Sequence, residues 1–215
     1  MEEEAAMFAD ANMSIAGSKM SCKSMIPAEA FDEIIKELRR KPLDTNHYRK
    51  LTGDGKSQAF GVVNKRCLKP DFSRQCWLRP YLYKLLLDFA EKYVDIPWTS
   101  VTVNQNYAAG RHRDRGNIGE SYLVAFGDYT GGELKFWEGE RAGIWDINKK
   151  PIVADFSELE HSVEPFEGER YSLVFYVCRG EYILPEPSVR LVNGEWRFFR
   201  GEEECHGLPH PLQKR

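Results

Sequence analysis

A histidine and an aspartate that stand two positions apart form the most informative chemical pattern of the chain. They are His112 and Asp114, in the segment Gly110-Arg-His-Arg-Asp-Arg-Gly-Asn117. In an extended segment, residues i and i+2 point the same way, so this imidazole and this carboxylate can bind one metal ion. A third ligand must come from elsewhere, and His161 is the best candidate. Two histidines and one carboxylate on one face of a metal favour non-haem Fe(II) that activates O2. A turn with a local hydrogen bond is the alternative interpretation of the pair.

A second pattern lies in Arg170-Tyr-Ser-Leu-Val-Phe-Tyr176, which begins nine residues after the second histidine. On a strand, alternate residues share a face, so Arg170 and Ser172 lie on the same side as Val174 and Tyr176. The residues between them form an apolar face that suits packing between layers. A buried guanidinium needs an anion, and a dicarboxylate ligand could supply one through a bidentate pair. A protein carboxylate, or an edge strand with Arg170 in water, is the alternative.

The part of the chain from about residue 99 to 177 resembles the Fe(II)/2-oxoglutarate-dependent dioxygenases. The resemblance rests on His112, Asp114, His161 and Arg170, which match that superfamily in order, with Ser172 completing an Arg-x-Ser motif. It implies a double-stranded β-helix in which the first three residues bind Fe(II). The last two would then bind the far carboxylate of 2-oxoglutarate. O2 would be the second cosubstrate, succinate and CO2 the products, and ascorbate a stimulant.

Within this superfamily the chain is most similar to the TET/JBP group, which oxidises the methyl group of 5-methylcytosine or thymine in nucleic acid. The two motifs above and the run 124–134 carry this likeness. It implies that Asn117 and Tyr176 contact the base. A histidine of TET enzymes is replaced here by Cys178, and the spacing from His161 to the arginine is nearer that of plant and prolyl hydroxylases.

Further polar and aromatic residues surround these motifs. Members of the superfamily often place an Asn or Tyr on the first strands beside 2-oxoglutarate, and the matching residues here are Asn104, Tyr107 and Tyr122. Ordinary strand polarity and a packed core tyrosine are the alternatives. Arg111 and Arg115 flank the metal motif and could guide an anionic substrate to the site. Arg113 lies between the two ligands and should point away from the metal. A solvated loop is their alternative. Stacking surface for a base could come from Tyr129, Phe136 and Trp137.

The most favoured substrate is therefore a nucleobase methyl group, in DNA or RNA that reaches the site through a local groove. The base would have to be single-stranded or flipped out of its stack. The net charge of −3 argues against binding of a long polyanion by bulk charge. Hydroxylation of a protein side chain such as proline, or of a small metabolite, is the first alternative. A catalytically silent jelly roll that only binds a partner is the second.

The predicted elements give an α+β fold in which N-terminal helices pack on one sheet of a jelly-roll core. Apolar spacing predicts helices over about 31–38 and 80–93. Strands are expected at 59–63, 101–107, 122–126, 133–137, 142–146, 152–156 and 171–177, and a last hairpin at 189–199. We expect a flexible tail over 1–24 and one domain over 25–215, with a helical part at 25–98, the core at 99–180 and a C-terminal extension at 181–215.

Composition narrows the class of protein. The chain has 215 residues, of which 42% are hydrophobic, enough to bury a core and exclude global disorder. No apolar run approaches the roughly 20 residues that span a bilayer. The five cysteines are scattered, which argues against a disulfide framework or a zinc site and favours a reducing compartment, the nucleus or cytoplasm. We expect a monomer without membrane contact.

Overall fold

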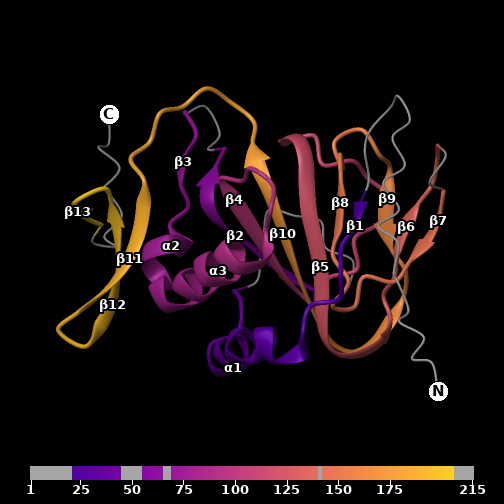
Figure 1. Cartoon of the computed structure of the whole chain (residues 1–215), viewed down its shortest axis with the longest axis horizontal. Helices are drawn as coiled ribbons and strands as arrows, with labels where there is room; N and C mark the ends of the chain where they lie inside the picture. Colours follow the sequence, from indigo (N-terminus) through magenta and orange to yellow (C-terminus); the bar gives the residue numbers. More distant parts are fainter. Residues whose placement is uncertain (1–20, 45–54, 65–68, 140–141, 206–215) are drawn as a thin grey trace, which may run out of the picture.

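The computed structural model describes residues 21–44, 55–64, 69–139 and 142–205, and it has an α+β fold with a β-rich core (Figure 1). Its largest sheet has seven strands in the order β1-β8-β5-β10-β4-β2-β3, paired in antiparallel fashion. In chain order these strands are β1 (Ser21–Cys22), β2 (Lys56–Val63), β3 (Asp71–Phe72), β4 (Ser100–Gln105), β5 (Asn117–Gly131), β8 (Ile152–Ala154) and β10 (Phe166–Cys178).

A second, three-stranded sheet faces part of the first. Its order is β7-β6-β9, and its strands are β6 (Leu134–Phe136), β7 (Gly143–Trp145) and β9 (His161–Val163). Leu123 and Ala125 of β5 pack with Leu134 and Phe136 of β6 in an apolar cluster between the sheets. The two facing sheets form the jelly-roll core that the sequence predicted.

The helices cover the other face of the large sheet (Figure 1). They are the 3-10 helix η1 (Ala28–Phe31), α1 (Asp32–Arg40), the short α2 (Gln75–Leu78) and α3 (Pro80–Tyr93). Ile34 and Leu38 of α1 are buried with Leu86 and Phe89 of α3 against β5 and β10. Helix α3 has the predicted bounds, and Pro80 occupies its first turn, where the missing N–H costs nothing. The prediction of helices on one sheet is confirmed.

The last described strands form a separate sheet, β11 (Pro187–Val192), β12 (Glu195–Arg200) and β13 (Glu203–Glu204). The predicted hairpin is present, and its turn residues Asn193 and Gly194 have φ angles of 51° and 82°, as a tight type I′ turn requires. Phe198 of β12 packs against Tyr83 of α3, with ring centroids 5.8 Å apart. This sheet therefore extends the helical layer.

Five short elements were absent from the prediction: β1, β3, α2, β9 and β13. Each has two to four residues, too few to show a periodic pattern. Strand β1 lies in the segment expected as a flexible tail, where Ser21 and Cys22 pair with Val153 and Ile152; residues 1–20 lie outside the described part. The part expected to be helical, 25–98, also adds β2 and β3 to the large sheet. Among the described residues, no helix has the length and apolarity to cross a membrane.

Candidate active site

Backbone pairing brings the two predicted histidines together. The N–H of His112 donates to the carbonyl of His161 at 2.9 Å, and the N–H of His161 donates back at 2.9 Å. Two residues further along, the N–H of Asp114 donates to the carbonyl of Phe156 at 2.8 Å. The loop that follows β4 is thereby joined to the start of β9 and to the segment between β8 and β9. Residues 49 positions apart in the sequence become direct neighbours.

The three side chains converge as a metal site requires. One ligand atom from each of His112, Asp114 and His161 lies within 4.8 Å of the others. The Nε2 atom of His112 is 3.3 Å from Oδ1 of Asp114, and the two imidazole centroids are 4.3 Å apart. In the part of the chain that the structure describes, this is the one cluster of three such residues.

Hydrogen bonds select the ring nitrogen that each histidine can offer to a metal. Nδ1 of His112 lies 2.7 Å from the carbonyl of Gly110, and Nδ1 of His161 lies 2.9 Å from the carbonyl of Leu159. A carbonyl only accepts, so both Nδ1 atoms carry the hydrogen. Each Nε2 then has the lone pair, which is the arrangement common to metal-binding histidines.

Burial favours the neutral form of His161. The residue is only 5% exposed, and the Phe156 ring lies edge-on at 4.9 Å from its imidazole. Desolvation lowers the pKa of His161, although the Leu159 carbonyl and Asp114 oppose that shift. A neutral imidazole is the form that binds a metal. Two such imidazoles and one carboxylate fit Fe(II) better than Mg²⁺ or Ca²⁺, which prefer oxygen ligands.

Arg170 is buried without a carboxylate partner among the described residues. It is 2% exposed, and its Nη2 donates to the carbonyl of Gly132 at 3.0 Å. The rings of Tyr129 and Phe166 each lie 5.4 Å from its guanidinium carbon. Its Nε is buried and has no acceptor in the described part of the chain. Burial lowers the pKa of the guanidinium, while Tyr129 and Glu133 act against that shift. A buried cation with an unused donor fits an anionic ligand.

Ser172 lies beside this arginine on the same face of β10. Its Oγ accepts a hydrogen bond of 3.1 Å from Nδ2 of Asn104, which lies opposite it on β4. Because that contact uses Oγ as an acceptor, the hydroxyl can donate its own hydrogen to a ligand. Arg170 and Ser172 thus present donors together, and this set fits the far carboxylate of 2-oxoglutarate.

One cavity of about 100 Å³ joins the metal cluster to the buried arginine. Nine of the predicted residues line it: Asn104, Tyr107, His112, Asp114, Asn117, His161, Arg170, Ser172 and Tyr176. A wider groove of about 640 Å³ lies outside it, and Tyr107, Asn117 and Tyr176 line both spaces. Arg115 and Cys178 line the outer groove but not the inner cavity. The sequence motifs therefore meet at one opening.

Tyr122 is placed elsewhere. It is 1% exposed in the apolar cluster below the helices, with its ring edge-on to Phe175 at 6.1 Å. Its neighbour Leu123 lines the cavity. Successive residues of a strand face opposite sides of the sheet, so Tyr122 faces the core and does not reach the cavity. The expectation that Tyr122 contacts 2-oxoglutarate is therefore wrong.

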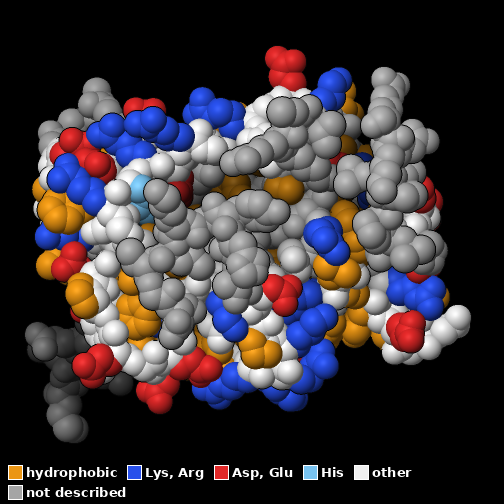
Figure 2. Space-filling model, turned by 180° about the vertical axis from the view of Figure 1, so that it is seen from behind, with side chains coloured by type: hydrophobic (Ala, Val, Ile, Leu, Met, Phe, Trp, Pro, Cys, Tyr) orange, Lys and Arg blue, Asp and Glu red, His pale blue; other side chains and the backbone are white. Residues whose placement is uncertain are grey.

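The residues suggested for guiding or stacking the substrate have other partners. Arg111 forms an ion pair of 2.6 Å with Glu160, and Arg113 forms one with Glu138. Phe136 is buried in the core between the sheets. The ring of Tyr129 lies against the guanidinium of Arg170. The ring of Trp137 is covered by Arg111 and Lys135. Figure 2 shows a histidine, in pale blue, at the surface beside a group of Lys and Arg side chains. Of the three arginines in the motif, only Arg115 has no ion pair with a described carboxylate.

Several residues of the site could not be recognised in the sequence. Leu134, Phe156 and Val163 line the cavity but look like ordinary apolar strand residues. Gly132 offers a signal in the sequence, because two consecutive glycines favour a tight turn, and Gly131 and Gly132 have positive φ angles of 75° and 72°. A Cβ atom added to Gly132 would lie 2.7 Å from Nε of Arg170. This glycine therefore makes room for the arginine.

We expect Gly132→Ala to weaken 2-oxoglutarate binding because it displaces the Arg170 side chain. An interaction loss of about 1.4 kcal/mol corresponds to roughly a tenfold rise in Kd. Gly139→Ala is the matched control, since Gly139 also has a positive φ, 80°, and a Cβ there would meet nothing within 4 Å. Isothermal titration with 2-oxoglutarate and Mn(II) would measure both. Equal affinities for the two variants would contradict the packing role of Gly132.

Comparisons with known proteins agree with this geometry at the level of the fold. No family model and no curated protein matches the chain. Among solved structures, NgTET1 in complex with 5mC DNA has 13% identity and a TM-score of 0.54, over 75% of this chain and 72% of that one. A prolyl hydroxylase in complex with a hypoxia inducible factor peptide fragment, from Trichoplax adhaerens, has 14% identity and a TM-score of 0.50, over 73% and 82%.

Both similar structures come from groups that the sequence motifs had suggested, the TET enzymes and the prolyl hydroxylases. The chain has the fold of the Fe(II)/2-oxoglutarate oxygenases, and its His-Asp-His cluster fits the metal of that superfamily. At these identities the likeness reaches no further than the fold.

Proposed function

We propose that this chain is an Fe(II)- and 2-oxoglutarate-dependent oxygenase that hydroxylates a C–H bond of its substrate. One observation carries this proposal. A single cavity is lined at once by the cluster of His112, Asp114 and His161 and by Arg170, a buried cation with an unused donor. A metal site alone, or a buried arginine alone, would each have simpler explanations.

Each side chain has a definite task in this proposal. His112, Asp114 and His161 hold Fe(II), and Arg170 and Ser172 hold the far carboxylate of 2-oxoglutarate. With O2, the bound pair would supply the oxidation of a C–H bond, with release of succinate and CO2. Leu123, Leu134, Val163 and Val174 form apolar walls. Apolar walls exclude water, which strengthens the interaction of Arg170 with a carboxylate.

For the substrate we propose a nucleobase methyl group, as in 5-methylcytosine or thymine. Asn117 and Tyr176 lie where the outer groove meets the cavity, so a base entering from the groove would touch both. Nδ2 of Asn117 contacts Asp114 at 3.5 Å and Ser121 at 3.2 Å, so this amide also helps to hold the metal carboxylate. The groove is open and lined by arginines, as a strand of nucleic acid requires. NgTET1, whose structure contains 5mC DNA, has the same fold.

A mass-shift screen would test the substrate class. The protein would be incubated with Fe(II), ascorbate and 2-oxoglutarate against pools of methylated DNA, methylated RNA and peptides. We expect a gain of one oxygen on a methylated base of single-stranded or flippable DNA or RNA. A product among the peptides alone would assign a protein side chain instead. Succinate formation without a product in any pool would point to a small metabolite.

Arg115→Ala should weaken action on oligonucleotides. Arg115 is exposed on the groove and has no ion pair with a described carboxylate, so it can contact a phosphate. Loss of one phosphate contact should lower kcat/KM by roughly three- to tenfold and reduce the slope of log affinity against log salt by about 1. Arg190→Ala, an exposed arginine of β11, is the control. An unchanged salt slope in Arg115→Ala would contradict this role.

A further inference from the structure

Trp137 lies against the strand that carries the second metal ligand. It directly follows β6 and is 39% exposed. Its backbone N–H donates to the carbonyl of Glu160 at 3.1 Å, and its indole N–H donates to Oγ of Ser162 at 2.9 Å. Glu160 and Ser162 are the residues on either side of His161. This one tryptophan therefore holds both chain neighbours of a metal ligand.

The same side chain also contacts the segment that carries the first ligand. The guanidinium carbon of Arg111 lies 4.6 Å from the centroid of the Trp137 ring. Nη2 of Arg111 reaches Oε2 of Glu160 at 2.6 Å. Arg111 directly precedes His112 in the chain. The residues before the two histidines are thus joined to each other by an ion pair, and both touch Trp137.

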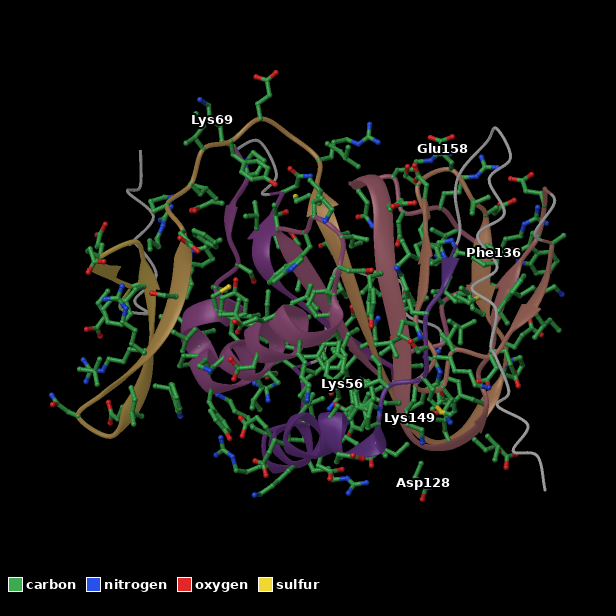
Figure 3. The ribbon with its side chains drawn as sticks, in the orientation of Figure 1. Lys56, Lys69, Asp128, Phe136, Lys149 and Glu158 are labelled. Atoms are coloured by element: carbon green, nitrogen blue, oxygen red, sulfur yellow. The ribbon has the colours of Figure 1, made fainter. Side chains whose placement is uncertain are left out.

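The backbone pairing that joins the two ligand-bearing segments is short, so side-chain contacts between them add support. His112 lies outside every named strand and reaches β9 through a single bridge to His161, flanked by hydrogen bonds from the N–H of Val163 to the carbonyl of Ala109 at 2.9 Å and from the N–H of Asp114 to the carbonyl of Phe156 at 2.8 Å. His161 itself also pairs with Phe136 in the ladder between β6 and β9. On the inner side, the rings of Phe136 and Phe156 lie 6.4 and 4.9 Å from the His161 ring, and Figure 3 labels Phe136 on the side of the molecule where β6 and β9 run. On the outer side, the contacts of Trp137 are polar and cationic. An exposed tryptophan with these partners has a role other than filling the core.

We infer that Trp137 is a positioning residue that fixes the separation of the two metal-binding imidazoles, through Ser162 on one segment and Arg111 on the other. This inference rests on the proposed metal site and adds a residue that the proposed function does not use. The Trp137 ring, which the sequence suggested as a stacking surface for a base, has the cations of Arg111 and Lys135 over it.

Metal binding by the protein without 2-oxoglutarate tests the inference. The Kd for Co(II), followed by its visible absorption under anaerobic conditions, would be compared for the unaltered chain, Trp137→Phe, Ser162→Ala and the double variant. Phenylalanine keeps an aromatic ring beside Arg111, although a smaller one, and removes the indole donor, whereas Ser162→Ala removes the acceptor and leaves the indole ring intact. We expect the Kd to rise about tenfold, the lower end of the effect of residues that orient metal ligands. The double variant should be no weaker than either single one, since both remove the same hydrogen bond.

Trp196→Phe is the matched control. Trp196 is on β12, where it stacks on Tyr81 at 5.8 Å and lies under Lys84, and it is not among the residues that line the cavity. A Kd within twofold of the unaltered value in Trp137→Phe, with or without a lower unfolding midpoint of the metal-free protein, would overturn the inference. So would additive effects of the two substitutions. Absence of Co(II) binding by the unaltered chain would instead overturn the metal site of the proposed function, and the inference with it.

Discussion

Asp114→Ala is expected to reduce succinate formation at least a hundredfold. Removing a residue that merely orients a metal ligand typically costs about ten- to a hundredfold in metal affinity or activity, and Asp114 is itself a ligand in our proposal. The variant also removes the negative charge that offsets the charge of a divalent ion. The measurement is 2-oxoglutarate turnover at saturating Fe(II), with metal affinity determined separately by Mn(II) titration.

Asp128→Ala provides the control for this substitution. Asp128 is an exposed aspartate on β5, and Figure 3 shows it at the opposite end of the molecule from Glu158, which precedes β9. It should keep the turnover and Mn(II) affinity of the unaltered chain. Turnover of Asp114→Ala within a factor of a few of that level would show that this carboxylate is not a ligand.

Arg170→Ala should raise the KM for 2-oxoglutarate by a hundredfold or more. Breaking a buried ion pair by removing one partner costs about 3–5 kcal/mol, and each 1.4 kcal/mol or so is a tenfold change in affinity. Arg170 is 2% exposed, so water cannot replace it easily. The effect should fall on KM, because the residue holds the end of 2-oxoglutarate that does not react.

Arg170→Lys separates the charge from the geometry of the guanidinium. A lysine keeps the charge but loses the planar pair of donors, so we expect a KM between those of the unaltered chain and the alanine variant. Arg190→Ala on the exposed β11 hairpin should leave the KM unchanged. If Arg170→Ala keeps the KM of the unaltered chain while folding normally, the anion that Arg170 binds is not 2-oxoglutarate.

The features that could be predicted from the sequence are those set by local periodicity. Helix α3 was predicted at its observed bounds because its apolar residues recur at helical spacing next to a proline. The alternation of β10 separated Arg170, Ser172 and Tyr176, which line the cavity, from the core residues Leu173 and Phe175. Strand geometry alone gives this separation, so it needed no tertiary information.

What could not be predicted depends on contacts between distant parts of the chain. Alternation divides a strand into two faces but does not say which layer covers each, and so Tyr122 was placed in the wrong group of candidates. The partner of Arg111 is 49 residues away, and that of Arg113 is 25 residues away. A charge that looks available in the sequence is paired once the strands are assembled. The same limit concealed the role of Trp137, whose partners are Glu160 and Ser162 on either side of His161 and Arg111 directly before His112.

The most direct test of the central claim is the visible absorption of the anaerobic protein after addition of Fe(II) and 2-oxoglutarate. We predict the weak charge-transfer band of a ferrous ion chelated by the keto acid. The band should be absent from Asp114→Ala, and Arg170→Ala should need much more 2-oxoglutarate to produce it. A flat spectrum from the folded, unaltered chain would contradict the account and favour a jelly roll that only binds a partner.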